Sequence, residues 1–470
     1  MKVAFIHYHL KPGGVTTVIR QQVEALRKIG GEALVFAGEP PPAAFPSETV
    51  PVPGLGYNHD TANPPPGESV AESIAKAIIK RWPGGCDIVH VHNPTLAKNS
   101  RFPDILEALQ KKGFRLLLQI HDFAEDGRPD FYSHAPYPTN CHHIVINSRD
   151  YRILLKAGLK KEGLHLLPNM VSPLELNSKK TAKASFVLYP VRAIRRKNIG
   201  EALLLSLYLK AGNHLAVTLP PNSPIDKIAY DDWKRFSKNH HLPVRFEAGL
   251  KHDFRTLAAA SRCFITASIT EGFGFSFLEP WTAGKPLRGR KLPDICSDFE
   301  TKGISLDDMY TRLLVPNDWF NHSGYLDSWR NAILRACGRF AWETPAAAVS
   351  EAEKHLFGSS GTDFGLLNEK YQKEVLQLLV EDPSKKTLLK QLNPFLGELR
   401  DLPFSKNRIR RNREVVLSDY NADKYQETLK GIYERATGEP VRHCIRKEVL
   451  LTEFFNLRRL NLLKWGVYEG

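Results

Sequence analysis

The sequence predicts an α/β protein with two doubly wound parallel-sheet domains and a helical C-terminal region. In both halves of the chain, short apolar runs typical of buried strands alternate with amphipathic helical segments. A polar stretch at 173–183 breaks this alternation and is typical of an interdomain linker. After Gly303 the sequence becomes mainly helical. We therefore expect domains at 1–175 and 184–415, with C-terminal helices over 416–470 that pack back on the first domain.

The N-terminal half begins with KVAFIH, a buried strand over 2–7. The turn Lys11-Pro12-Gly13-Gly14 leads into a helix over 15–29, whose apolar positions form one stripe. Further strands are expected over 32–37, 87–92, 115–120, 144–147 and 165–167, with helices over 69–81 and 103–112. Residues 39–67 hold nine prolines, which is typical of a mobile surface loop or of an acceptor-side lid.

The second half repeats the same alternation of strands and helices. Strands are expected over 186–191, 214–219, 243–248 and 262–267, and helices over 199–210, 226–239, 253–260 and 275–284. Two more helices, 421–436 and 445–464, close the chain. The last has an apolar stripe and basic polar positions, so it either packs on the protein or lies on an anionic membrane; we favour packing.

Composition limits the function classes. The 470 residues are 42% hydrophobic and 25% charged, which is ordinary for a globular protein and excludes collagen, wholesale disorder and a multi-span membrane protein. The N-terminus does not resemble a signal peptide and the six cysteines form no CxxC pair, so we expect a cytoplasmic protein. The net charge of +14 favours an anionic partner.

Two glycine turns are candidate binding sites. The turn at Gly13 and Gly14 exposes backbone N–H groups at a helix start, which suits a phosphate or a sugar hydroxyl, although a plain βα turn has the same pattern. No G-x-G-x-x-G fingerprint occurs there, which argues against a nicotinamide dehydrogenase. The second turn, Gly272-Phe273-Gly274, lies between two glutamates, Glu271 and Glu279. Carboxylates near a helix start also stabilise the helix dipole, so a purely structural role stays open.

Candidate charged and polar groups follow two predicted strands. Arg192 and Lys197 lie just past a strand, where open α/β sheets bind ligands, and could hold a diphosphate or face water. His121 ends another strand and could donate to a hydroxyl or carry a proton, or simply precede an N-cap Asp. His90 and His92 share a strand face, but without a third ligand a metal pair is weakly supported. We therefore expect no metal and no cofactor.

Several segments together resemble the retaining glycosyltransferases of family 4, which have the GT-B fold. The most specific is FITASITEGFGFSFLEPWTAGKPL (264–287), because it holds the E-x7-E signature as Glu271 and Glu279. The others are GGVTTVIRQQVEAL (13–26), DIVHVHNP (87–94), LLLQIHD (116–122), HHIVINS (142–148), LLPNMV (166–171) and VRAIRRKN (191–198). The resemblance implies two facing Rossmann-like domains with a cleft between them, an N-terminal acceptor side and a C-terminal nucleotide-sugar side.

The resemblance also implies roles for individual residues. The donor would be a UDP-, GDP- or ADP-hexose, and the acceptor an unidentified sugar, lipid or small molecule. Glu271 with the amides around Phe273 and Gly274 would hold the sugar, Glu279 the ribose, and Arg192 with Lys197 the diphosphate, while Gly14 closes on the phosphates and His121 contacts the sugar. Gly13 and Gly272 belong to the same donor-binding turns. The family retains configuration and needs no metal.

One segment departs from the family pattern, and other functions are compatible with the sequence. After Lys285-Pro286 the family pattern gives way to the basic segment LRGRKLPD (287–294), where Arg288 and Arg290 either contact phosphate or face water. A glycan phosphorylase or an inverting transferase could have the same fold. The net charge of +14 and the basic run SKNRIRRNR (405–413) are compatible with a nucleic-acid-binding protein, but no RNA-binding signature accompanies them. A silent nucleotide-sugar-binding homologue is the remaining alternative, and we expect peripheral contact with an anionic membrane at most.

Overall fold

The computed structural model describes residues 1–58, 65–176, 186–358, 361–458 and 464. The chain divides into two compact units. Unit 1 comprises Met1–Met170 and Tyr420–Phe455, and unit 2 comprises Val171–Asp419 and the described residues from Asn456 onward. Unit 1 is therefore made from two separate parts of the sequence.

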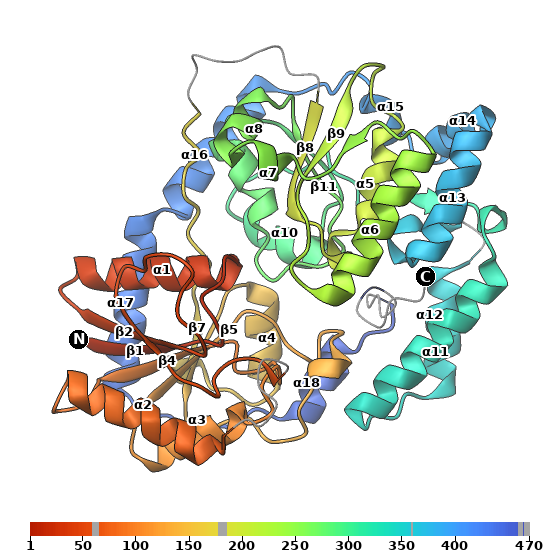
Figure 1. Cartoon of the computed structure of the whole chain (residues 1–470). Helices are drawn as coiled ribbons and strands as arrows, with labels where there is room; N and C mark the ends of the chain where they lie inside the picture. Colours follow the sequence, from red (N-terminus) through yellow and green to blue (C-terminus); the bar gives the residue numbers. More distant parts are fainter. Residues whose placement is uncertain (59–64, 177–185, 359–360, 459–463, 465–470) are drawn as a thin grey trace. The chain divides into compact units, whose positions relative to one another are not determined.

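Unit 1 contains a parallel sheet with the strand order β3-β2-β1-β4-β5-β6-β7 (Figure 1). The strands are β1 (Lys2–Ile6), β2 (Glu32–Ala37), β3 (Glu48–Pro51), β4 (Ile88–His92), β5 (Leu116–Ile120), β6 (His142–Val145) and β7 (Leu164–Leu166). The helices are α1 (Gly14–Lys28), α2 (Gly67–Arg81), α3 (Phe102–Lys111), α4 (Ser148–Lys156), α17 (Ala422–Gly438) and α18 (Lys447–Phe454), with short 3₁₀ turns η2 (Pro129–Phe131) and η3 (Lys161–Gly163). The order reverses between β1 and β4, as in a doubly wound sheet.

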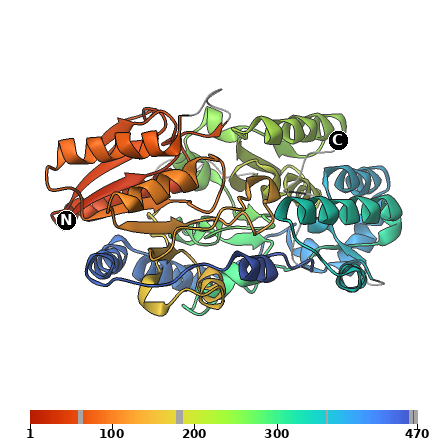
Figure 2. The ribbon, with the colours of Figure 1, turned by 90° about the horizontal axis from the view of Figure 1, so that it is seen from below.

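Helices cover both faces of this sheet because the buried strands are apolar on both sides. Ala4 and Ile6 pack in one core with residues of α2 and α3. Val3 and Phe5, which alternate with them along β1, pack in a second core with residues of α1 and α17. Figure 2 shows the red and orange strands of unit 1 as a layer with helices on either side.

Unit 2 has a smaller parallel sheet with the order β10-β9-β8-β11-β12. Its strands are β8 (Phe186–Arg192), β9 (His214–Leu219), β10 (Val244–Arg245), β11 (Phe264–Thr266) and β12 (Leu287–Gly289); β13 (Leu314–Val315) and β14 (Thr362–Asp363) pair separately and antiparallel. The helices α5 (Ile199–Ser206), α6 (Pro224–Asn239), α7 (Ala248–Lys251), α8 (Phe254–Ala260), α9 (Glu279–Thr282) and α10 (Pro293–Glu300) follow the strands.

A mainly helical region follows α10 in unit 2, as the sequence indicated after Gly303. It contains α11 (His322–Phe340), α12 (Ala346–Leu356), α13 (Glu369–Glu381), α14 (Pro383–Leu392), α15 (Phe395–Glu398) and α16 (Lys406–Asp419). The 3₁₀ turns of unit 2 are η4 (Arg195–Lys197), η5 (Phe275–Phe277), η6 (Asn317–Trp319) and η7 (Phe364–Leu366). The predicted fold class, two Rossmann-like α/β parts with extra helices, is confirmed.

Three sequence expectations need correction. The proline-rich segment 39–67 contains strand β3, which pairs with β2 at the sheet edge, where prolines are tolerated. The helix expected over 275–284 is instead a 3₁₀ turn, η5, followed by the single turn α9, which has a proline at its start. The helix expected over 445–464 is only Lys447–Phe454 long, and 459–463 fall outside the described residues.

Candidate active site

The ends of β8 and β11 bring a carboxylate and two cations together in unit 2. Lys197 contacts Oε1 of Glu271, and Arg196 donates from Nη1 to Oε2 of Glu271 at 2.9 Å. The same guanidinium nitrogen donates to the Thr270 carbonyl at 2.9 Å. Burial opposes the charge of Glu271, but Lys197 and Arg196 outweigh it and lower the pKa of this carboxyl to about 2. Glu271 is therefore ionised throughout the physiological range.

Tyr189 joins the two loops that carry these charges. Its hydroxyl donates to the Lys197 carbonyl at 2.5 Å and accepts from the Ala267 amide at 3.2 Å. The Tyr189 side chain is buried in the strand before the first loop. One side chain of β8 therefore holds η4 against the segment that follows β11.

The glycine turn after Glu271 is fixed by backbone geometry. Gly274 has φ of +92°, which L side chains rarely adopt, and a Cβ there would lie 2.7 Å from the Phe277 ring. Phe273 is buried and packs edge-on against Phe299, with 5.8 Å between ring centroids. The predicted GFG turn is thus closely packed, and any residue other than glycine at position 274 would strain the backbone.

Glu279 starts α9 and differs electrostatically from Glu271. Burial raises the pKa of Glu279 to about 7, although Lys197 acts to lower it. Within the described residues, no hydrogen bond to the Glu279 carboxyl is present. The two glutamates of the E-x7-E signature therefore lie near the same lysine, one fully ionised and the other titrating near neutral pH.

Arg192 does not join this cluster. Its Nη1 donates to the Pro220 carbonyl at 3.1 Å and to Oδ1 of Asn222 at 2.6 Å, on the loop after β9. The joint role expected for Arg192 and Lys197 at a donor diphosphate requires no contact between the two cations, so it stays a prediction. The cation that accompanies Lys197 is Arg196, which sequence reasoning missed although it lies in the same VRAIRRKN segment.

The basic segment 287–294 is also structural rather than ligand-facing. Arg288 is buried on β12 and pairs with Asp308 at 2.5 Å. Arg290 is buried and forms two-pronged hydrogen bonds with Glu201, at 2.9 and 2.7 Å, and with Asp363, at 2.8 and 2.7 Å. The expectation of a solvated face is wrong, because both side chains are buried. Both arginines already pair with carboxylates, which leaves the expected phosphate contact without support.

In unit 1, the turn at Gly13 and Gly14 opens α1. Gly13 is the N-cap and is fully extended, and no side chain caps the helix. A Cβ on Gly14 would meet nothing within 4 Å, so this helix start is sterically open. Uncapped N–H groups at an open helix start can receive an anion.

His121 lies at the end of β5 and is held by the neighbouring strand. Oδ1 of Asn93 accepts hydrogen bonds from the amides of His121, at 3.0 Å, and Asp122, at 3.2 Å. Asn93 itself is in the left-handed region, with φ of +56°. Arg128 pairs with Asp122 at 2.9 Å. Burial lowers the pKa of His121 to about 4, so its imidazole is neutral at physiological pH.

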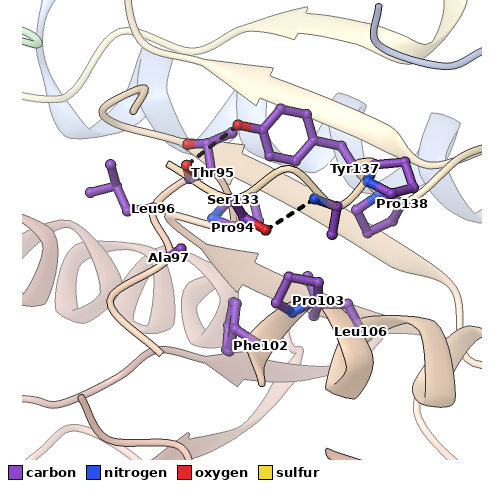
Figure 3. A pocket seen from close by; sticks show the side chains of 12 residues that line it. Pro94, Thr95, Leu96, Ala97, Phe102, Pro103, Leu106, Ser133, Tyr137 and Pro138 are labelled. Carbon is purple, nitrogen blue, oxygen red and sulfur yellow. Dashed lines mark hydrogen bonds between the residues drawn. The ribbon is translucent and has the colours of Figure 1, made fainter. Parts of the chain in front are cut away.

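A small cavity lies beneath the loop that follows Asn93. The loop residues 94–97, α3 and the segment 133–138 line it, and Figure 3 shows the Tyr137 hydroxyl directed at Thr95. Tyr137 donates to the Thr95 carbonyl at 3.4 Å and to the buried Glu125 at 2.9 Å. The cavity measures about 10 Å³, space for about one water molecule, so it is too small for a substrate.

Neither a metal-binding cluster nor a membrane-spanning helix is present among the described residues. Across the described ranges, no group of three or more His, Cys, Asp or Glu side chains is placed to hold a metal ion. His90 instead contacts Gln119 and Tyr433, both at 3.0 Å. Among the described helices, none is long and apolar enough to cross a membrane.

Comparisons with known proteins agree with this geometry. Residues 12–173 match the model of glycosyltransferase family 4. The mannosylglucosyl-3-phosphoglycerate synthase of Petrotoga mobilis is 27% identical over 522 aligned positions, covering 97% of this chain and 98% of that protein. Anabaena Alr3699/HepE in complex with UDP and glucose superposes with a TM-score of 0.52 at 13% identity, covering 92% of this chain and 98% of that one. The Rickettsia africae glycosyltransferase gives 0.51 at 11% identity, covering 93% and 99%.

Two Rossmann-like units with these matches define the chain as a glycosyltransferase of the GT-B fold class. The match to the family-4 model covers residues 12–173, which lie almost entirely in unit 1. The signature glutamates Glu271 and Glu279 and the cations around them lie in unit 2, outside the part matched by that model.

Proposed function

We propose that the chain is a retaining, metal-independent transferase that moves a hexose from a nucleotide sugar to a phosphorylated glycosyl acceptor. The observation that carries the donor half of this proposal is the cluster of Glu271, Lys197 and Arg196 at the ends of β8 and β11. Ligands of open α/β sheets bind at the carboxyl ends of the strands, which is where this cluster lies.

The cluster suggests a division of work. Ionised Glu271 accepts hydrogen bonds from sugar hydroxyls, while Lys197 and Arg196 stabilise the negative charge that grows on the leaving diphosphate. These fixed cations supply the positive charge that a metal ion supplies in other transferases. Gly14 and the open start of α1 provide a further phosphate contact. Glu279, once ionised, accepts from the two ribose hydroxyls.

The acceptor proposal rests on the Petrotoga relative and on one cationic site. That relative is named as the synthase of a compound with mannosyl and glucosyl groups on 3-phosphoglycerate. In unit 1, the Lys98 ammonium donates to the Tyr57 hydroxyl at 3.2 Å and lies over the rings of Tyr57 and Phe131, at 4.9 and 5.6 Å. A lysine held on two aromatic rings in unit 1, the side of the molecule expected to bind the acceptor, suits a phosphate or carboxylate group.

A matched transfer assay tests this function. The full-length protein is incubated with GDP-mannose, UDP-glucose or ADP-glucose and with glucosyl-3-phosphoglycerate, and the product is identified by mass spectrometry and by the anomeric coupling in its NMR spectrum. The control acceptor is glucosylglycerate, which lacks the phosphate. We expect one donor to give a product with the phosphorylated acceptor, both with and without EDTA. The transferred sugar in this product should keep the anomeric configuration that it has in the donor.

Three results would contradict separate parts of the proposal. An inverted anomeric centre would exclude retention. Loss of transfer in EDTA, restored by Mg²⁺, would exclude metal independence. Equal rates with both acceptors, or no transfer to either while another acceptor is used, would exclude recognition of the phosphate.

A further inference from the structure

Three imidazoles stack at the ends of β4 and β5 in unit 1. The rings of His90 and His92 are 4.6 Å apart between centroids and inclined by 24°, and those of His92 and His121 are 5.3 Å apart and inclined by 17°. Between the last two rings, Nδ1 of His92 and Nε2 of His121 are 3.0 Å apart, a hydrogen-bond distance. His92 therefore touches the residue expected to contact the donor sugar through one specific pair of nitrogens.

All three rings are buried and uncharged. His90 and His92 have no exposed surface, and 6% of His121 is exposed. Burial lowers the pKa of His92 well below its usual value and that of His121 to about 4. A neutral imidazole carries one proton, on either Nδ1 or Nε2. The contact between His92 and His121 therefore holds one proton, and its position fixes the tautomer of both rings.

The other nitrogen of His92 decides between the two arrangements. Nε2 of His92 is buried and has no hydrogen-bond partner within the described part of the chain. If His121 donated, Nε2 of His92 would carry a buried N–H with no acceptor, which is rare in folded proteins. If His92 donates from Nδ1, the buried Nε2 holds only a lone pair. The second arrangement avoids the orphaned donor.

We infer that His92 donates its Nδ1–H to Nε2 of His121 and so fixes His121 as an uncharged hydrogen-bond donor through Nδ1. His92 is then a positioning residue, which acts on the reaction only through His121. The inference deepens the proposed function, since it rests on His121 contacting the donor or acceptor. The ligand atom opposite His121 must accept a hydrogen bond, so it is a hydroxyl or phosphate oxygen. His121 does not take the proton of the acceptor hydroxyl.

The tautomer can be measured directly in the ligand-free protein. Long-range ¹H–¹⁵N correlation spectra of the full chain, with ¹⁵N-labelled histidine, report which ring nitrogen carries the proton. The His121 signals are assigned by their loss in His121→Phe and, independently, in His121→Gln. We expect protonated Nδ1 and bare Nε2 for His121. A proton on Nε2 of His121 would overturn the inference, whatever the catalytic activity.

Variants of His92 then test its positioning role with the substrates identified by the transfer assay. His92→Asn offers an amide N–H near the position of Nδ1, His92→Phe keeps the stacked ring without a donor, and His92→Asp offers only acceptor oxygens. We expect Asn to keep kcat within about threefold of the parent. Phe and Asp should lower kcat by roughly 100-fold, as loss of one preorganised donor does.

A double variant separates positioning from general damage. If His92 acts only through His121, His92→Phe combined with His121→Phe has the same kcat as His121→Phe alone. If kcat of the double variant fell by the product of the two single-variant fold-losses, the positioning role would be contradicted. Each protein is first compared by its melting temperature. If His121→Phe itself has parental kcat, the proposed catalytic contact of His121 fails, while the NMR result still decides the tautomer.

Discussion

Lys197 and Glu271 form a partly buried ion pair that joins the turn after β8 to the turn after β11. Arg196 completes this pair from the same turn as Lys197. The residues lie far apart in the sequence, and both loops also meet at the Tyr189 hydroxyl. Substitutions at these loop ends therefore affect both the charge and the geometry of the candidate donor site.

The two signature glutamates should have different kinetic roles. Glu271→Gln removes a charge that faces the reacting sugar and should lower kcat by roughly 100-fold. Glu279→Gln removes a charge-assisted hydrogen bond to the ribose, worth about 1.5–3 kcal/mol, and should raise the donor KM with little change in kcat. Steady-state kinetics with varied donor at saturating acceptor measure both. The reverse pattern would exchange the two roles.

Glu279 should also make stability and donor binding depend on pH. Its pKa rises from 4.5 to about 7 on folding, so the native state holds this proton more tightly than the unfolded chain. Stability from this group is therefore present below pH 4.5 and is lost as pH rises through 7. Glu279→Gln avoids that loss and should be more stable than the parent at pH 8, by at most about 3 kcal/mol, and nearly equal to it at pH 4.5.

Melting temperatures at both pH values check this expectation. Glu271→Gln is the control with the opposite sign, because the pKa of Glu271 is lowered to about 2 and its ionised form stabilises the fold above pH 4.5. In the parent, the donor KM should rise as pH falls below 7, because protonated Glu279 no longer accepts from both ribose hydroxyls. A donor KM that is flat between pH 6 and 8 would contradict the ribose contact.

Removal of Arg290 should strongly destabilise the protein, because this side chain is buried between two carboxylates. Arg290→Met leaves the buried carboxylates of Glu201 and Asp363 without their partner, which typically costs about 3–5 kcal/mol. The matched control is Arg330→Met, since Arg330 pairs with Glu353 on the exposed surface and should contribute about 1 kcal/mol or less. Urea denaturation of the three proteins compares them. Equal midpoints would show that the buried network adds no stability.

Two glycines should respond in opposite ways to alanine. Gly274→Ala places a Cβ 2.7 Å from the Phe277 ring at a positive φ and should destabilise the protein by about 1–3 kcal/mol. Gly14→Ala meets open space and should leave the melting temperature unchanged. If phosphates approach the start of α1, Gly14→Ala should still raise the donor KM. A parental donor KM in Gly14→Ala would place the phosphates elsewhere.

The fold was largely predictable because its strands are unusually apolar. Buried parallel strands such as β1 and β8 appear in the sequence as short continuous hydrophobic runs, and helices such as α1 as regular stripes. Strand β3 was missed because it lies at the edge among prolines, where pairing with β2 outweighs local preference. The helix at 275–284 was overestimated because Pro280 and the positive φ of Gly274 break it into two turns.

The site was predictable only where residue type alone carries the information. Glu271 and Lys197 could be found from their place after strands, since parallel strand ends meet at one sheet edge. Arg290 could not be interpreted, because its partners Glu201 and Asp363 lie far away in the sequence and nothing local reveals them. Likewise, nothing in the sequence around Asn93 indicates that its side chain accepts hydrogen bonds from the two amides after β5.

The discontinuous make-up of unit 1 has a consequence for how the chain is synthesised. Tyr425, Leu429 and Ile432 of α17 belong to the core on one face of its sheet, together with Val3 and Phe5 of β1. A ribosome completes all of 171–419 before it releases α17. During that interval one face of the nascent N-terminal sheet has α1 but lacks α17, and apolar surface exposed in this way binds chaperones or aggregates. The N-terminal part of this protein is therefore made first but is completed only after 171–419 have been synthesised.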